Sequence, residues 1–186
     1  MPIETEIKLA VLDPQPILDR IAALGYLQRG ERQLEQDQLF DQRNGELRSA
    51  GQTLRIRTRG DRSTLTYKGP RFKAALKSRE EIELDLSDGP AFILILAALG
   101  YYPSFAYEKF RTTFAKAGEP GIITLDETPI GSFLELEGDA DWIDKTAEAL
   151  GFSAVDYMTQ SYAGLYRKFC QTNPGATYGR EMGMKF

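Results

Sequence analysis

The stretch IETEIKLAV, Ile3 to Val11, alternates charged and apolar side chains near the start of the chain. Successive side chains of a β-strand point to opposite faces. Glu4, Glu6 and Lys8 therefore share one face, and apolar residues occupy the other. The stretch predicts an amphipathic strand, and it raises the question of what three neighbouring charges would meet on their face.

The same alternation recurs in most of the strand-like stretches. The charges that share strand faces in this way are Arg55, Arg57 and Arg59; Lys68; Arg79, Glu81, Glu83 and Asp85; Lys109 and Arg111; Asp126; and Glu135 and Glu137. One interpretation is an amphipathic antiparallel sheet whose polar face lies in water. Charges of the same sign cluster, however: acidic pairs lie in three strands and basic pairs in two, with few neutral polar residues between them. This pattern favours a face that binds a specific charged ligand.

Three helices are predicted by a shared pattern of start and stop signals. An aspartate precedes each one, at Asp13, at Asp88 and at Asp139 or Asp141, where its side chain can cap free backbone N–H groups. Each ends in Ala-Leu-Gly followed by an aromatic residue, with the glycines at 25, 100 and 151. Glycine at this position closes a helix in a left-handed conformation.

Turn signals divide the remaining sequence into strands. Hairpins are expected at Asn44-Gly45 and Gly60-Asp61, with further reversals at 119–121 and 129–131. The total is about eight strands, which, if they close into a barrel, enclose room for one small ligand. We predict an α+β fold: an eight-stranded antiparallel closed β-barrel, or tunnel, with a charged lumen and amphipathic helices outside. Residues 1–170 are expected to form this single domain, and 171–186 a loosely ordered tail.

Composition narrows the functional classes. The 186 residues are 42% hydrophobic and 27% charged, which suits one globular domain. A net charge of -4 argues against general nucleic-acid binding. The longest apolar run, Ala91 to Leu99, is too short to cross a membrane. A single cysteine and no apolar N-terminal segment favour a cytoplasmic location.

The chain contains no histidine. The usual general base and the commonest transition-metal ligand are therefore missing. Chemistry must rest on carboxylates, lysine, arginine, tyrosine or metal-bound water. A lumen that mixes carboxylates with guanidinium and ammonium groups suits a polyphosphate held by Lys and Arg, with Mg²⁺ or Mn²⁺ bridging it to the carboxylates.

An ordered set of motifs resembles the CYTH superfamily, the triphosphate tunnel metalloenzymes, over about residues 1–169. The motifs are ETEIK (4–8), EQDQLFD (35–41), LRIR (54–57), LTYKGP (65–70), SREEIE (78–83), EKFR (108–111), LDETPIGSFLELEG (125–138) and the late Ser161-Tyr162. Within the superfamily the sequence is most similar to the class IV adenylate cyclases. The resemblance implies a tunnel with two divalent metals, Mg²⁺ or Mn²⁺, and frequently a homodimer.

The resemblance also implies roles for individual residues. Catalytic residues are expected at Glu4, Glu6, Lys8 and Arg57. Substrate phosphates are expected on Lys8, Arg55, Arg57, Lys68, Arg79, Lys109 and Arg111. Metal ligands are expected at Glu4, Glu6, Glu81, Glu83, Asp126, Glu135 and Glu137.

Three functions are compatible with these residues. The first is an adenylate cyclase that converts ATP to cyclic AMP and pyrophosphate. The second is a tripolyphosphatase or thiamine triphosphatase that uses the same tunnel. The third is a non-catalytic binder of polyphosphate or nucleotide, which would have less need of so many aligned acids.

Overall fold

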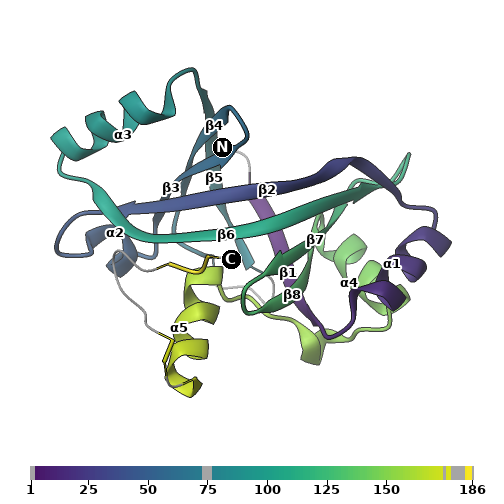
Figure 1. The fold of residues 1–186 in the computed structure, drawn as a ribbon. Helices are drawn as coiled ribbons and strands as arrows, with labels where there is room; N and C mark the ends of the chain where they lie inside the picture. The colour runs from purple at the N-terminus through teal and green to yellow at the C-terminus, as the bar shows by residue number, and fades with distance from the viewer. Residues whose placement is uncertain (1–2, 73–76, 174, 177–182, 186) are drawn as a thin grey trace.

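Eight antiparallel strands close into a barrel in the computed structural model, which describes residues 3–72, 77–173, 175–176 and 183–185 (Figure 1). Around the barrel the order is β1-β5-β4-β3-β2-β6-β7-β8. The strands are β1 (Ile3–Val11), β2 (Leu27–Asp41), β3 (Thr53–Arg59), β4 (Arg62–Lys68), β5 (Lys77–Leu86), β6 (Tyr102–Ala115), β7 (Ile122–Thr128) and β8 (Gly131–Glu137). The predicted fold class is confirmed.

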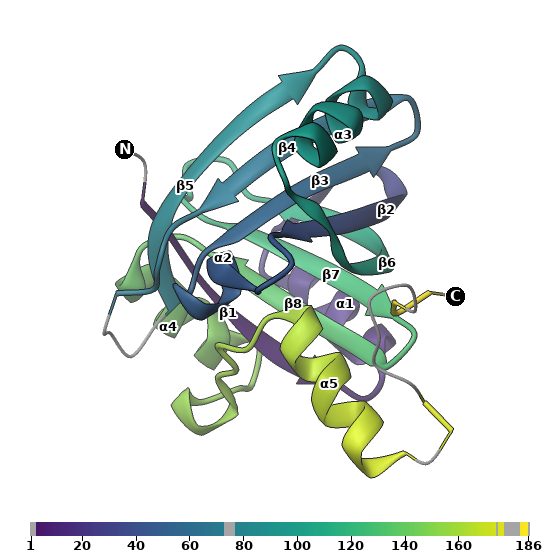
Figure 2. The same ribbon diagram turned by 90° about the vertical axis from the view of Figure 1, so that its left-hand side faces the viewer.

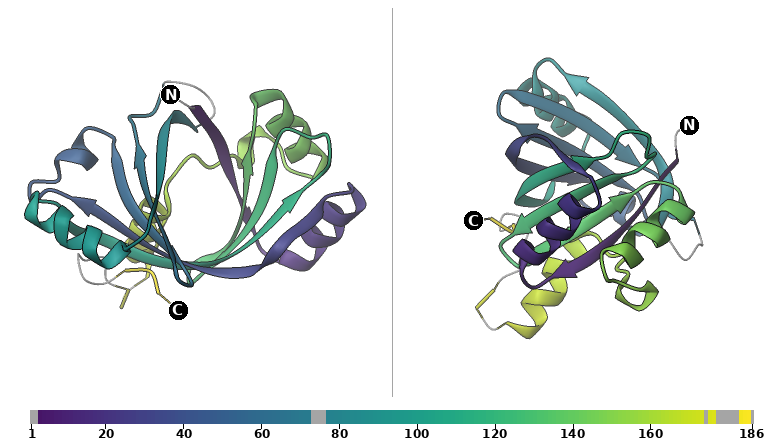
Figure 3. Two further views of the ribbon diagram at one scale, coloured as in Figure 1. Left: turned by 90° about the horizontal axis from the view of Figure 1, so that it is seen from above. Right: turned by 90° about the vertical axis from the view of Figure 1, so that its right-hand side faces the viewer.

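Helices lie against the outside of the barrel and at one of its ends (Figures 2 and 3). They are α1 (Pro14–Ala23), α2 (Glu46–Ser49), α3 (Gly89–Ala98), α4 (Ala140–Ala149) and α5 (Tyr162–Thr172), with a 3-10 turn at Ala154–Asp156. In the view from above, α3 lies on one side of the ring of strands, and α1 and α4 lie on the other (Figure 3, left). None of the helices in the described part of the chain is long and apolar enough to span a membrane.

The predicted helix boundaries are confirmed by their caps. The side chains of Asp13, Asp88 and Asp139 each accept a hydrogen bond from a backbone N–H in the first turn, at distances of 3.1, 2.9 and 2.8 Å. Of the two aspartates considered for α4, Asp139 is therefore the cap. The three stop glycines have φ values of +84°, +87° and +88°, which side chains other than glycine rarely adopt.

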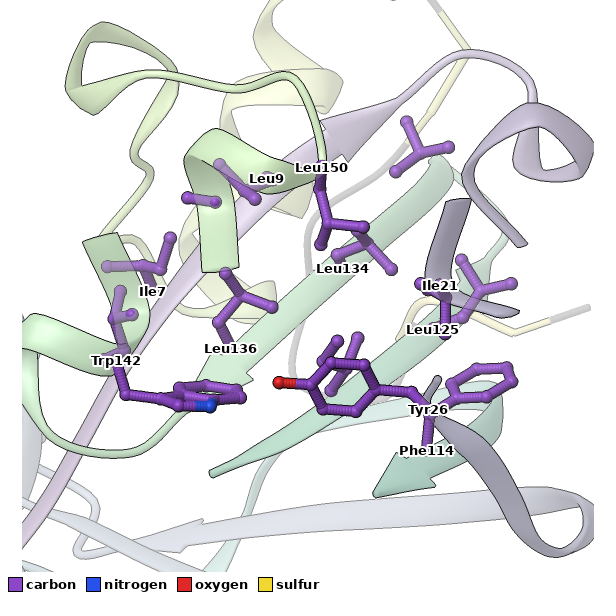
Figure 4. Close-up of a cluster of buried hydrophobic side chains, with 14 residues drawn as sticks. Ile7, Leu9, Ile21, Tyr26, Phe114, Leu125, Leu134, Leu136, Trp142 and Leu150 are labelled. Atoms are coloured by element: carbon purple, nitrogen blue, oxygen red, sulfur yellow. The ribbon is translucent and has the colours of Figure 1, made fainter. Parts of the chain in front are cut away.

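The apolar residues of the alternating strands lie outside the lumen, under the helices. Strands β1, β7 and β8 bury their outer faces against α1 and α4 in the largest hydrophobic cluster (Figure 4). Ile7, Leu9, Leu134 and Leu136 are fully buried there. A second cluster joins Phe40, Ile56 and Leu96 between α3 and the far wall of the barrel. Most of the hydrophobic core is therefore a layer around the barrel. A smaller cluster joins Phe105, Tyr107 and Phe133 to Tyr162 of α5, and the rest of the lumen lining is largely polar.

One expected turn differs from the structure. Asn44-Gly45 does not form a tight hairpin, because the short helix α2 lies between β2 and β3. The Asp41 carboxylate accepts hydrogen bonds from the backbone N–H groups of Gln42, Leu47 and Arg48, which stabilises this excursion. Gly60-Asp61 does join β3 to β4 as a two-residue hairpin, as predicted.

The expectation of a loose tail over 171–186 is not tested as a whole, because much of that segment lies outside the described residues. At Met184 the structure differs from it. Met184 is 1% exposed, donates its N–H to the Ala106 carbonyl at 3.0 Å and accepts the Glu108 N–H at 2.7 Å. Strand β6 pairs with β7 only from Phe110 onward, so its earlier residues have an edge that this segment occupies.

The outer core should dominate stability. We expect Leu136→Ala to lower the free energy of unfolding by about 2–5 kcal/mol, because it opens a cavity in the layer beneath α4. Leu94→Ala is the matched control, because Leu94 on α3 is 72% exposed. Urea denaturation followed by circular dichroism measures both, and equal effects would contradict this location of the core.

Candidate functional site

The lumen contains a cavity of about 520 Å³. It is lined by every predicted site residue except Asp126: Glu4, Glu6, Lys8, Arg55, Arg57, Lys68, Arg79, Glu81, Glu83, Lys109, Arg111, Glu135 and Glu137. Glu4, Glu6 and Lys8 of β1 therefore face the lumen, together with charges from five other strands. The barrel brings together side chains that lie up to 133 residues apart, from Glu4 to Glu137.

Strand register places opposite charges beside each other. Lys8 lies opposite Glu135 across β1 and β8, Lys68 opposite Glu81 across β4 and β5, and Arg111 opposite Asp126 across β6 and β7. Directly opposed side chains are close enough to interact. The Lys8 Nζ is 2.8 Å from Glu135 Oε1, and the Lys68 Nζ is 2.5 Å from Glu81 Oε2.

One side of the cavity holds more acids than nearby cations can neutralise. Lys68 contacts Glu4 as well as Glu81, with its Nζ 2.7 Å from Glu4 Oε2. Burial, followed by the hydrogen bond with Glu4, raises the pKa of Glu81 to about 7. Burial and the charge of Glu4 also raise the pKa of Glu137. These carboxylates would accept a further positive charge.

Cations in the same cavity also lack partners. Arg79 is 7% exposed, and its Nε has no hydrogen-bond partner; no ion pair joins it to any residue in the described part of the chain. The Arg55 Nε is likewise buried without a hydrogen bond, 3.4 Å from Asp37 Oδ1. Burial and the neighbouring Arg55 lower the pKa of Lys68 despite its two acidic contacts. A buried donor without an acceptor is costly, so these groups favour an anionic ligand.

Asp126 lies on the lumen face of β7 but does not line the cavity, where Lys109, Arg111 and Tyr162 are bonded to it. It is fully buried and accepts hydrogen bonds from Lys109 at 2.7 Å and from Arg111 at 2.6 Å through each of its oxygens. Arg111 also bonds Glu135. Asp126 therefore holds the Lys109 and Arg111 side chains toward the lumen. Its expected role as a metal ligand stays a prediction.

Tyr162, the first residue of α5, connects this helix to the same network. Its hydroxyl donates to Asp126 at 2.6 Å, and its ring lies 5.0 Å from the Lys8 Nζ and 4.8 Å from the Lys109 Nζ. Burial and the charge of Asp126 raise the pKa of Tyr162, so the phenol stays a neutral donor. Ammonium groups this close to an aromatic face are attracted to it. Tyr162 was quoted in a sequence motif but not assigned to the site.

Two further carboxylates were missed among the site residues. Glu35 and Asp37 on β2 are both almost fully buried. Arg57 donates to Asp37 through two nitrogens, at 2.9 and 3.2 Å, and its Nη1 is 3.1 Å from Glu35. Much of the Arg57 hydrogen-bonding capacity is therefore used within the wall. The two-residue spacing of Glu35 and Asp37 is the same signal that identified the other charged faces.

The two carboxylates are held ionised in the wall. Burial alone would raise the pKa of Asp37, but Arg57 and Arg55 outweigh it and lower the pKa. Arg57 and Lys109 likewise bring the pKa of Glu35 well below its usual range against the effect of burial. Glu35 and Asp37 are thus counter-charges for the cations rather than proton donors.

The donor chemistry fits a hard divalent cation. Mg²⁺ and Mn²⁺ prefer carboxylate oxygens, and Glu4, Glu6, Glu81 and Glu137 offer such oxygens along the lumen. Burial first, and then the neighbouring Glu4, raise the pKa values of Glu81 and Glu137, so a bound cation would stabilise their charged forms. Within the described ranges no three acidic groups already converge on one ion position, so a bound ion would require small side-chain shifts.

Comparisons with known proteins identify the family and the fold. The family model described as the CYTH domain matches residues 2–162. A curated protein of Methanocaldococcus jannaschii, named "Putative adenylate cyclase", is 30% identical over 173 residues, which span 88% of this chain and 98% of that protein.

Two solved structures are similar in fold. A Vibrio parahaemolyticus protein described in the same words has a TM-score of 0.75 and 20% identity over 92% of this chain and 98% of that one. A Hippeastrum adenylyl cyclase candidate, described as revealing a dominant triphosphatase activity, has a TM-score of 0.65 and 14% identity over 91% and 96% of the two chains.

The acidic cluster should be measurable by titration. Without metal, the Glu81 side-chain carboxyl should titrate near pH 7 in carbon-detected NMR, with Glu81→Gln used to assign its signal. Because the folded-state pKa is raised, Glu81 should destabilise the fold increasingly as pH rises from about 4.5 to 7, and Glu81→Gln should remove this loss. Added Mg²⁺ should lower the midpoint; a midpoint below 5 without metal would contradict the crowding of these acids.

Proposed function

The chain belongs to the CYTH domain family, and from that premise we propose that it is a divalent-metal-dependent enzyme acting on a nucleoside triphosphate. The proposed reaction converts ATP to cyclic AMP and pyrophosphate. In this reaction the ribose 3′-oxygen forms a bond to the α-phosphorus, and the bond from that phosphorus to the pyrophosphate oxygen breaks.

The main support is the presence of unmatched charges of both signs in one cavity. The Nε atoms of Arg79 and Arg55 are buried donors with no hydrogen-bond partner among the described residues, whereas Glu81 and Glu137 are carboxylates whose pKa values burial and Glu4 raise. A simple anion would match only the first group, and a metal ion only the second. A metal–triphosphate complex matches both.

The size and lining of the cavity favour a substrate larger than a bare phosphate chain. A volume of about 520 Å³ lies in the range of cavities that hold whole organic ligands. Leu39, Thr53 and Tyr107 add apolar and hydroxyl surface to the charged lining. These residues could contact a nucleoside, and the name of the Methanocaldococcus jannaschii relative suggests that the base is adenine.

The side chains of the cavity would have different roles according to their positions. Arg55 and Arg79 would bind phosphate oxygens through buried Nε donors that have no hydrogen-bond partner among the described residues, and Lys68 would add its charge beside Glu4 and Glu81. Lys109 and Arg111, held by Asp126, would stabilise negative charge on the departing pyrophosphate, because fixed charges need no reorganisation during the reaction. A divalent cation on Glu4, Glu6, Glu81 and Glu137 would supply positive charge to the phosphates and lower the pKa of the attacking hydroxyl.

A triphosphatase is the second candidate. The charged lining recognises a phosphate chain whether a ribose hydroxyl or water attacks it, and the described activity of the Hippeastrum protein illustrates this alternative in the same fold. Its substrate would be tripolyphosphate or thiamine triphosphate. A binder without turnover would need the cations but not the unmatched acids, so the acidic cluster argues against it.

Product analysis separates the candidates. The purified protein should be incubated with Mg²⁺ or Mn²⁺ and, separately, ATP, thiamine triphosphate and tripolyphosphate, and the products resolved by chromatography. We expect cyclic AMP and pyrophosphate from ATP, with loss of at least 100-fold in rate in Glu6→Gln because an acid of the cavity is neutralised. Glu46→Gln, at the exposed start of α2, is the control.

Orthophosphate without cyclic AMP would identify the protein as a triphosphatase. Binding of ATP without any metal-dependent product would contradict both enzymatic proposals.

Arg79 should contribute mainly to substrate binding. We expect Arg79→Gln to weaken triphosphate binding by about 1.5–3 kcal/mol, roughly 10- to 150-fold in Kd, because a buried charged donor loses its anionic partner. Isothermal titration with a non-hydrolysable ATP analogue and Mg²⁺ measures this change. Arg48→Gln removes an exposed arginine that lines neither lumen cavity and should have no effect; an equal effect would exclude Arg79 as a phosphate ligand.

A further inference from the structure

A second cavity, of about 140 Å³, lies beside the first along the lumen faces of β2, β3 and β6. Arg59 and Arg111 line both cavities and form the partition between them. Beyond the partition the lining includes Arg29, Gln33 and Thr113. None of these last three belongs to the main cavity or to the predicted site.

The second cavity is built by a break in the pairing of β2 with β6. Arg29 lies opposite Thr113 and Gln33 opposite Arg111, so the residues 30–32 of β2 face Thr112 alone. Gly30 has a φ of +72°, a conformation suited to such a bulge. Bulges redirect side chains and occur next to active sites. Here the extra residues separate Arg29 from Gln33 along the wall and leave the hollow between them.

The charges around the second cavity leave one guanidinium available. Arg59 pairs with the buried Glu35, whose Oε1 is 2.6 Å from the Arg59 Nη2, and Arg111 is held by Asp126. Arg29 forms no hydrogen bond or ion pair with the residues that the structure describes, and both Arg29 and the acidic Glu31 are exposed at the rim. Three arginines that approach from three strands can bind an oxyanion through several donors at once.

Arg59 of the partition is more exposed than Arg57 of the same strand. The side chain of Arg59 is 42% exposed, whereas that of Arg57, the next arginine along β3, is 8% exposed and fixed by two carboxylates. Arg59 donates to Glu35 through Nε and Nη2, each 2.6 Å from Oε1, and its exposed part faces both cavities. An anion in the main cavity that moved toward this end of the barrel would meet Arg111 and Arg59 first and Arg29 next.

We propose that the second cavity is an anion site that receives the inorganic phosphate group released in the main cavity. Its volume corresponds to four or five waters at about 30 Å³ each, which suits one phosphoryl group. That group belongs to orthophosphate or to one end of pyrophosphate, with the other end still at the partition. The source of the anion rests on the proposed function, but its binding does not require turnover.

The test is a titration of the uniformly ¹⁵N-labelled protein with sodium phosphate and, separately, sodium pyrophosphate at constant ionic strength. The backbone amides of Gly30 and Thr113 and the Arg29 Nε–H should shift with a saturable curve. In Arg29→Gln the apparent affinity at these amides should fall at least 10-fold, and in Thr113→Val it should fall less. Arg48→Gln removes the same charge from an exposed position outside both cavities and should leave the curve unchanged.

Three outcomes would overturn the proposal: no saturable shift at Gly30 and Thr113, equal curves in Arg29→Gln and wild type, or equal weakening by Arg48→Gln, which would indicate a non-specific charge effect. A companion measurement uses Arg79→Gln. This variant should weaken binding in the main cavity and leave the shifts at Gly30 unchanged. If no triphosphate is turned over but these shifts persist, the proposed function fails and the anion site stands. If triphosphate is turned over but these shifts are absent, the proposed function stands and the anion site fails.

Discussion

The burial of charge inside the barrel is the constraint on which the rest of the structure depends. A buried ion without a partner is strongly unfavourable, so each charge in the lumen must be paired by the protein or by a ligand. The network around Asp126 shows the first solution: one fully buried carboxylate takes hydrogen bonds from Lys109, Arg111 and Tyr162. Two residues of β6 and one residue of α5 are fixed by that single group on β7.

A lumen filled with charge cannot supply the hydrophobic core. Most of the core is instead the layer between the outer faces of the strands and α1, α3 and α4, and a smaller cluster packs between β6, β8 and α5. This division explains why the strands alternate so regularly and why the three covering helices share the same capping and stop signals. The helices stabilise the barrel from outside, which leaves its interior available for a ligand. Helix α5 is different, because Tyr162 brings it into the charged network itself.

Pairing inside the lumen is incomplete in a spatially ordered way. In the wall formed by β2 and β3, Arg57 is matched, because it lies between Asp37 and Glu35. Toward β4, β5 and β1, the buried Arg79 Nε has no hydrogen-bond partner among the described residues, and Glu81 lies beside Glu4. At the bulge of β2, Arg29 lacks a partner among the described residues. The matched wall provides a rigid support, and the unmatched regions on its two sides are where ligands would complete the charge balance.

The sequence alone determined the features that depend on neighbours within one element. The two-residue period placed Glu4, Glu6 and Lys8 on one face, and the aspartate and glycine signals located three helices, because both follow from local backbone geometry. Only the tertiary structure decided which charges meet. It placed Asp126 in contact with Lys109 and Arg111, paired Arg57 with Glu35 and Asp37, and brought Tyr162 beneath Lys8 and Lys109. Those contacts depend on barrel closure and on the register between strands distant in sequence, which no single strand encodes.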